Sequence, residues 1–193
     1  ITEIYPQEKK RYYVKVPAFS FSKLRGMDAY LSPEMKSTGE AIGYDKKLHR
    51  AVYKAMVASG MVLHNYGTVV VSVADEDKEE TLPLIRRFYD MGFNIEATSL
   101  TGEFMKAHGI RTRILLKPSE GSEEVLDSLR AGYVSYVINT RAILSGKHFG
   151  DGVAIRCVAA QNNIAMLTSL DTVRMLLDVL EEVTLGISTI DAE

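Results

Sequence analysis

Two threonines in the stretch ATSLTGEF (residues 97–104) lie three positions apart, where an apolar segment gives way to a polar one. Hydroxyl groups and backbone N–H groups at the start of a helix can hold a phosphate, because the helix dipole favours an anion there. The same residue types are also ordinary helix N-caps. Thr98 and Thr101 therefore indicate either a phosphate site or a capped helix, and the stretch alone leaves both interpretations open.

Further polar residues come directly after apolar segments elsewhere in the chain. They are Ser72, Asp75, Asp77, Lys78, Lys117, Asn139, Thr140, Thr168 and Ser169. The ammonium, amide and hydroxyl groups among them suit an anion such as phosphate. Each also has a simpler interpretation, such as a solvated lysine, a loop charge, a helix N-cap or an asparagine that forms a turn.

Other kinds of site find no support in the sequence. The four histidines, at positions 49, 64, 108 and 148, are scattered, and no histidine–cysteine cluster has metal-ligand spacing. A glycine-rich loop of the G-x-x-x-x-G-K-S/T type is absent as well. We therefore predict no metal site in this chain, and these patterns assign no catalytic residues. The residues themselves lead as far as a small ligand that carries a phosphate.

A regular alternation of strands and helices must position these residues. We expect strands at 68–73, 93–98, 112–116, 134–138 and 164–168, with helices at about 79–91, 99–108, 122–132, 152–163 and from 171 onward. Such strand–helix units predict an α/β fold, namely a doubly wound, five-stranded parallel sheet with helices on both faces. Ligands of these sheets bind outside the carboxyl ends of the strands. The polar residues named above should therefore gather at one edge of the sheet.

Composition limits the class of protein. The 193 residues are 46% hydrophobic and 25% charged, which is typical of a globular chain of one domain with an appendage. The net charge of −2 gives no reason to expect nucleic acid as a partner. No apolar run reaches the roughly 18 residues that cross a bilayer, so we expect no membrane. The single cysteine, Cys157, fits a reducing compartment and hence the cytoplasm.

Several segments resemble a known family. Residues 69–110, with LLKPSEG (115–121), VINT (137–140) and DGVAIRCVA (151–159), are similar to the C-terminal allosteric domain of the carbamoyl-phosphate synthetase large chain, a methylglyoxal-synthase-like domain. Residues 14–60, which include SPEMKSTGE (32–40), resemble the end of the second ATP-grasp synthetase unit of that enzyme. The resemblance implies three parts: the synthetase tail (1–43), a connecting helix and linker (44–65), and the effector-binding domain (66–193).

The resemblance also implies roles for individual residues. The effector phosphate would be bound by Lys78, Thr98, Thr101 and Ser72, and the ribose and base by Lys117, Asn139, Thr140 and Arg141. Thr168 corresponds to a residue that contacts ornithine in some members of the family. The sequence departs from the family pattern at Leu100, where glycine is usual, and at Arg141 and Cys157. These departures bear on the identity of the effector.

The function implied by the resemblance is regulatory. The domain would bind a nucleotide monophosphate of the UMP or IMP type, with ornithine as a further candidate ligand. The parent enzyme is a ligase of pyrimidine or arginine biosynthesis that uses ATP, magnesium and potassium and works with a glutaminase small subunit and with the rest of the large chain. The carboxylates and lysines of its ATP sites lie outside the matched segments, so we expect this fragment alone to be inactive and to hold no cofactor.

Two other function classes fit parts of the sequence. A free-standing lyase of the methylglyoxal synthase type would need carboxylates to move protons at this edge, and Asp75 and Asp77 are the candidates near the first strand of the sheet. Basic and aromatic residues interleave at 9–25 as they do in some nucleic-acid-binding modules. The net negative charge disfavours that interpretation, and a strand explains the alternation more simply.

Overall fold

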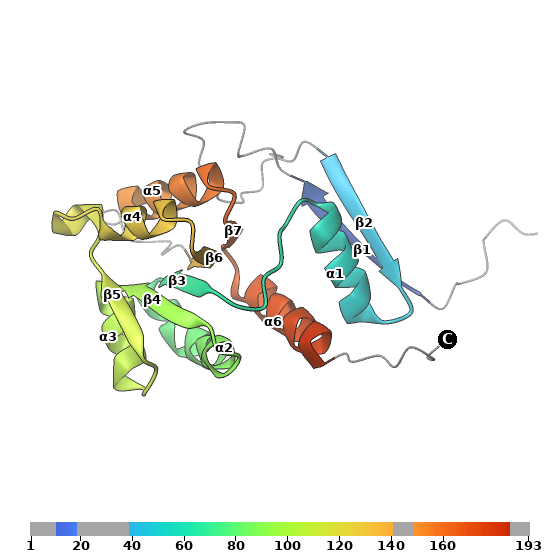
Figure 1. The fold of residues 1–193 in the computed structure, drawn as a ribbon, viewed down its shortest axis with the longest axis horizontal. Coiled ribbons are helices and arrows are strands. Elements are labelled where there is room, and N and C mark those ends of the chain that lie inside the picture. The colour runs from blue at the N-terminus through green and yellow to red at the C-terminus, as the bar shows by residue number, and fades with distance from the viewer. Residues whose placement is uncertain (1–10, 19–38, 141–148, 186–193) are drawn as a thin grey trace, which may run out of the picture.

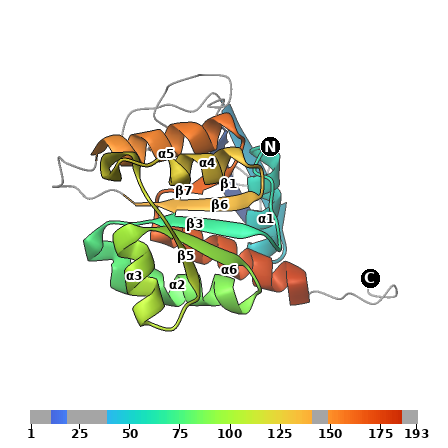
Figure 2. The same cartoon turned by 60° about the vertical axis from the view of Figure 1, so that its left-hand side comes forward.

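The computed structural model describes residues 11–18, 39–140 and 149–185, with side chains described up to residue 182 except that of Phe149 (Figure 1). Five parallel strands form one sheet in the order β5-β4-β3-β6-β7. Helices cover both faces (Figure 2). The predicted α/β fold is thus confirmed. Residues 32–38 of the SPEMKSTGE motif, and Arg141, lie outside the described residues.

The strands of this sheet are short and almost completely buried. They are β3 (Thr68–Ser72), β4 (Asn94–Thr98), β5 (Thr112–Leu115), β6 (Val134–Asn139) and β7 (Ala165–Leu167). In β3 the valines at 69, 70 and 71 have no exposed surface, because the sheet is covered on both sides. A run of β-branched apolar residues fits this environment, which explains why it was identifiable from the sequence.

The helices divide between two apolar cores. On one face α2 (Lys78–Asp90), α3 (Ser99–Ala107) and α6 (Leu170–Leu185) pack with Val69, Val71, Tyr136 and Ile138 of the sheet. On the other face α4 (Glu124–Arg130) and α5 (Phe149–Gln161) pack on Val70, Leu115 and Val137. Figure 2 shows this sandwich, with α4 and α5 above the sheet and α2, α3 and α6 below it.

An antiparallel hairpin with its own helix precedes the sheet. Strand β1 (Tyr12–Ala18) pairs with β2 (Gly39–Asp45), and α1 (Leu48–Ala58) lies on one side of the pair. Glycine is required at Gly43, since a Cβ atom there would lie 2.1 Å from the carbonyl oxygen of Ala51. Helix α1 also buries Val52 and Met56 in the core that α2 and α6 share. The predicted division at 1–43, 44–65 and 66–193 stays a prediction.

None of the helices in the described part of the chain is both long and apolar enough to cross a bilayer.

Candidate functional site

The carboxyl ends of β3 and β6 form the centre of the candidate site. The strand order reverses between these two neighbours, because β4 and β5 continue on one side and β7 on the other. Such a switch point is where ligands bind in open α/β sheets. Ser72 and Asn139 are paired in register there, and the Asn139 side-chain amide donates from Nδ2 to the Ser72 carbonyl oxygen at 3.1 Å.

Thr98 and Ser72 bring their hydroxyl groups together at the ends of the adjacent strands β4 and β3. Thr98 Oγ1 donates to Ser72 Oγ at 3.2 Å. Thr98 occupies the N-cap position of α3 with an extended backbone, yet its side chain makes no capping hydrogen bond. Thr101 is buried in the first turn of the same helix. Of the two interpretations that the sequence left open, side-chain capping by Thr98 is therefore not what the structure contains.

Lys78 opens α2 directly after the 3₁₀ turn η2 (Asp75–Asp77), which follows β3. Its side chain is 14% exposed, and Nζ lies 2.7 Å from Oδ1 of Asp75. The Asp75 side chain is largely exposed, so water can solvate this carboxylate when another anion takes its place. The Lys78 ammonium group is therefore held at the start of α2, and a bound anion can replace Asp75 as its partner.

Lys117 and Thr140 complete the polar groups of this edge. Lys117 precedes the 3₁₀ turn η3 (Pro118–Glu120) and places Nζ 3.8 Å from Oδ2 of Asp151. Thr140 follows β6, and its Oγ1 accepts a hydrogen bond from the backbone N–H of Ala74 at 3.0 Å. This contact ties the end of β6 to the segment that leads into η2.

Two buried charged residues of α5 were not singled out by the sequence analysis. Asp151 is 6% exposed and Arg156 is 2% exposed. Arg156 donates from Nη1 to Oδ1 of Asn139 at 2.7 Å, and Asp151 accepts from the backbone N–H and the hydroxyl of Ser119. The sequence signal for Arg156 was weak. A single charged residue in the apolar stretch Ile155 to Ala160 looks like the solvent-facing side of an ordinary helix.

The remaining predicted residues have different outcomes. Thr168 follows β7 and is half-buried. The unusual Leu100 is 55% exposed in the first turn of α3, so most of its side chain faces solvent. At Gly102 a Cβ atom would lie 2.8 Å from a side-chain carbon of Ile114, so a glycine in this helix lets α3 approach the sheet closely. Within the described residues, no group of three or more His, Cys, Asp or Glu side chains could hold a metal ion.

Comparison with known proteins gives a match to one family model and a set of similar solved structures. Residues 80–168 match the family model of the MGS-like domain. A methylglyoxal synthase from Elizabethkingia anophelis NUHP1 is 16% identical, with a TM-score of 0.48 over 60% of this chain and 79% of that one. A structure named ForH is 19% identical, with a TM-score of 0.47 over 61% of this chain and 80% of that one. The five-stranded sheet and its helices have the MGS-like fold.

Proposed function

We propose that the carboxyl edge of the sheet binds a nucleotide monophosphate of the UMP or IMP type, and that the chain is the regulatory part of a glutamine-hydrolysing carbamoyl-phosphate synthetase large chain. One observation carries the binding proposal. Thr98 directs its hydroxyl to Ser72 across two strand ends instead of capping α3, which leaves the start of that helix without a side-chain partner from Thr98. A phosphate satisfies helix N–H groups of this kind.

The proposed phosphate half of the site combines hydroxyls with one cation. Ser72, Thr98 and Thr101 supply hydroxyl groups, and Lys78 supplies an ammonium group at the N-terminus of α2. The helix dipole disfavours a cation at a helix N-terminus, and Asp75 offsets this as the counter-ion of Lys78. A bound phosphate would take over that role. Lys117, Asn139 and Thr140 lie at the ends of the other strands, where the ribose and base would extend.

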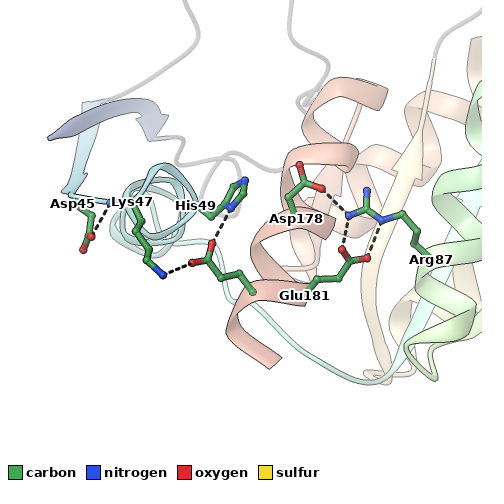
Figure 3. Close-up of polar contacts among 7 residues, drawn as sticks. Asp45, Lys47, His49, Arg87, Asp178 and Glu181 are labelled. Atoms are coloured by element: carbon green, nitrogen blue, oxygen red, sulfur yellow. Dashed lines mark hydrogen bonds and ion pairs between the residues drawn. The ribbon is translucent and has the colours of Figure 1, made fainter. Parts of the chain in front are cut away.

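A regulatory role requires a connection between the site and the rest of the chain, and α6 supplies one. Arg87 of α2 binds Asp178 at 2.6 Å and both carboxylate oxygens of Glu181 at 2.8 Å. Glu182, on the next position of α6, binds Nδ1 of His49 at 2.7 Å and lies 3.7 Å from Nζ of Lys47 (Figure 3). Helix α6 therefore joins the helix that begins with Lys78 to the helix of the hairpin.

Coupling through such contacts is worth typically about 1–3 kcal/mol in allosteric proteins. That range is reachable here, because several contacts of α6 would change together if α2 moved. The polar contacts to α1 and α2 also come with apolar ones, since Val52, Phe88 and Leu180 belong to the same core. A movement of Lys78 can therefore be transmitted to α1 through side chains that are packed together.

Calorimetric titration of single variants tests the binding proposal. Lys78→Ala should weaken binding of UMP or IMP about tenfold to a hundredfold, as loss of a charge-assisted hydrogen bond does. Binding of uridine or inosine, which carry no phosphate, should change little. Lys106→Ala is the matched control, because it removes the same charge from the exposed last turn of α3, at the other end of that helix. Equal affinity of the parent and Lys78→Ala for the monophosphates would place the phosphate elsewhere.

A second candidate function rests on Asp151. A lyase that releases phosphate from dihydroxyacetone phosphate needs a general base to take a proton next to the carbonyl group. Asp151 is a buried carboxylate at the correct edge of the sheet, whereas Asp75 is exposed. Both Asp151 oxygens already contact Ser119 or Lys117, which favours a positioning role. Formation of methylglyoxal from dihydroxyacetone phosphate by the purified chain, lost in Asp151→Asn, would support the lyase instead.

A further inference from the structure

Helix α5 carries two of the three charged side chains that are buried in the described part of the chain. These are Asp151 and Arg156, and the third is Glu96 of β4. Burial of a charged group is costly unless hydrogen bonds and opposite charges offset the loss of water. Arg156 contacts Asn139 of the candidate site, and Asp151 contacts Ser119 and lies near Lys117 of that site.

Arg156 determines how the amide of Asn139 is oriented. A guanidinium has only N–H donors, so the group that faces it at 2.7 Å is the amide oxygen Oδ1. The amide nitrogen is thereby directed away from Arg156, and it donates to the Ser72 carbonyl oxygen at 3.1 Å. An amide nitrogen has two hydrogens, and this contact uses one of them. The Asn139 amide nitrogen is consequently fixed as the donor end of a side chain that is 2% exposed, at the point where β3 and β6 end.

Asp151 holds the turn that follows β5 in a comparable way. Its Oδ1 accepts from the Ser119 backbone N–H at 3.0 Å, and its Oδ2 accepts from the Ser119 hydroxyl. The same Oδ2 lies 3.8 Å from Nζ of Lys117, whose side chain is 12% exposed. The contacts to Ser119 fix the turn η3 on α5, and the charge of Asp151 holds the Lys117 ammonium beside that turn.

A glycine makes room for the contact between Arg156 and Asn139. A Cβ atom at Gly152 would lie 3.1 Å from Nη1 of Arg156 and 3.6 Å from Oδ1 of Asn139. At Gly150, two residues earlier in the same helix, a Cβ atom would meet nothing within 4 Å. The two glycines therefore differ in what an added methyl group would disturb, although they share one helix and one type of backbone.

We propose that α5 sets the nucleotide specificity of this site through Arg156 and Asp151, which act as positioning residues. This inference rests on the proposed function. Arg156 presents Asn139 to the ligand as a donor, and so selects a ribose or base group that accepts a hydrogen bond. Asp151 fixes where Lys117 stands. The proposed phosphate ligands Lys78, Thr98 and Thr101 come from α2, β4 and α3, which these contacts do not involve. The fourth, Ser72, receives the Asn139 hydrogen bond at its backbone carbonyl oxygen, not at its hydroxyl.

The decisive experiment compares Gly152→Ala with Gly150→Ala. Both changes add one methyl group to the start of α5 and raise helix propensity alike. Gly152→Ala should weaken binding of UMP or IMP about threefold to tenfold, the range expected for one displaced hydrogen bond. Its affinity for inorganic phosphate should stay within about twofold, and Gly150→Ala should leave both affinities unchanged. A role in stability alone would lower the melting temperature of Gly152→Ala without changing the ratio of the two affinities.

Two conservative variants separate the roles of the positioning residues. Arg156→Lys keeps the charge but loses the fixed fork of donors, and Asp151→Asn keeps the shape but loses the charge. In NMR spectra of the ligand-free protein, Arg156→Lys should move the side-chain amide resonances of Asn139 and not the Nζ resonance of Lys117. Asp151→Asn should do the reverse.

The outcomes distinguish failure of this inference from failure of the proposed function. If the parent chain binds neither UMP nor IMP, the proposed function is wrong, and the NMR spectra still decide whether Arg156 and Asp151 position Asn139 and Lys117. If the nucleotides bind but Gly152→Ala weakens phosphate and nucleotide equally, α5 does not set specificity. Unchanged Asn139 resonances in Arg156→Lys would likewise overturn the positioning role.

Discussion

The two sheets of this protein bury their residues in opposite ways. In β3 three consecutive valines are fully buried, because α2 and α6 cover one face of the sheet while α4 and α5 cover the other. In β2 burial alternates: Ala41 and Gly43 face α1, whereas Ile42 is 62% exposed and Tyr44 is 52% exposed. A strand that is buried on both faces has a continuous apolar run, whereas in a strand buried on one face the buried and exposed residues alternate.

This difference predicts where the free energy of folding is concentrated. The parallel sheet has helices on both faces and shares one core with α1. The outer face of the hairpin holds a stacked pair, Tyr13 and Tyr44, with ring centroids 6.0 Å apart and more than half of each side chain exposed. Burial of an aromatic ring contributes far more than a stacked contact in water.

The largest effect is expected from a pair of aromatic truncations. Phe88 of α2 is fully buried, with ring centroids 5.3 Å from Phe93 and 5.9 Å from Tyr136. Phe88→Ala should lower the free energy of unfolding by about 3–5 kcal/mol, since it removes a buried ring and leaves a cavity. Tyr44→Ala should cost less than about 1 kcal/mol. Urea unfolding followed by circular dichroism measures both, and a comparable loss from the two variants would contradict the contrast between the sheets.

A smaller effect is expected where the hairpin unit joins the sheet. The buried Tyr136 of β6 donates its hydroxyl to the His64 carbonyl oxygen at 2.7 Å and accepts from the His64 backbone N–H at 2.6 Å. Tyr136→Phe removes both bonds and should cost about 1–2 kcal/mol, because His64 is half-buried and water replaces them in part. No loss of stability in this variant would mean that the linker is held by other contacts.

The same tyrosine should make the stability of the protein depend on pH in the alkaline range. Burial raises the pKa of Tyr136 from 10.0 to about 12. A raised pKa in the folded state means that the unfolded chain loses this proton first, so stability is complete below pH 10 and falls between pH 10 and 12. The slope of unfolding free energy against pH in this range should be shallower in Tyr136→Phe. An unchanged slope would show that Tyr136 does not titrate as described.

The smallest effect is expected at the polar contacts between α2 and α6. The hydrogen bond from Arg87 lowers the pKa of Glu181 below its ordinary 4.5. A lowered carboxyl pKa contributes stability above pH 4.5 that is lost as the pH falls through the folded-state value. Arg87→Leu should therefore cost about 0.5–1 kcal/mol at pH 7, since the pair is partly exposed, and less at an acidic pH below 4.5. A cost that stays equal at both pH values would assign it to packing of the Arg87 side chain.

Much of the parallel sheet was predictable from the sequence. Each strand is a short apolar run followed by helix-start residues, and these local signals place β3, β4 and β6 within two residues of where the structure has them. Strand β2 was not predicted, because GEAIGYD contains two glycines and little apolar periodicity. It becomes a strand because it pairs with β1, which is distant in the sequence, and because α1 packs closely on Gly43. No local signal encodes that approach.

The sequence by itself determined the sheet, the order of its elements and the fact that polar groups collect at the carboxyl ends of the strands. Parallel pairing follows from strand–helix alternation alone, so these features need no knowledge of distant contacts. Only the tertiary structure decided what those groups do. Thr98 could cap α3 or face a neighbouring strand, and the adjacency of β3 and β4 turned it toward Ser72. Arg156 and Asp151 acquire their roles because α5 packs beside Asn139 and Ser119, which lie 17 and 32 positions away in the chain. The hydrogen bonds formed there offset the cost of burying the two charges.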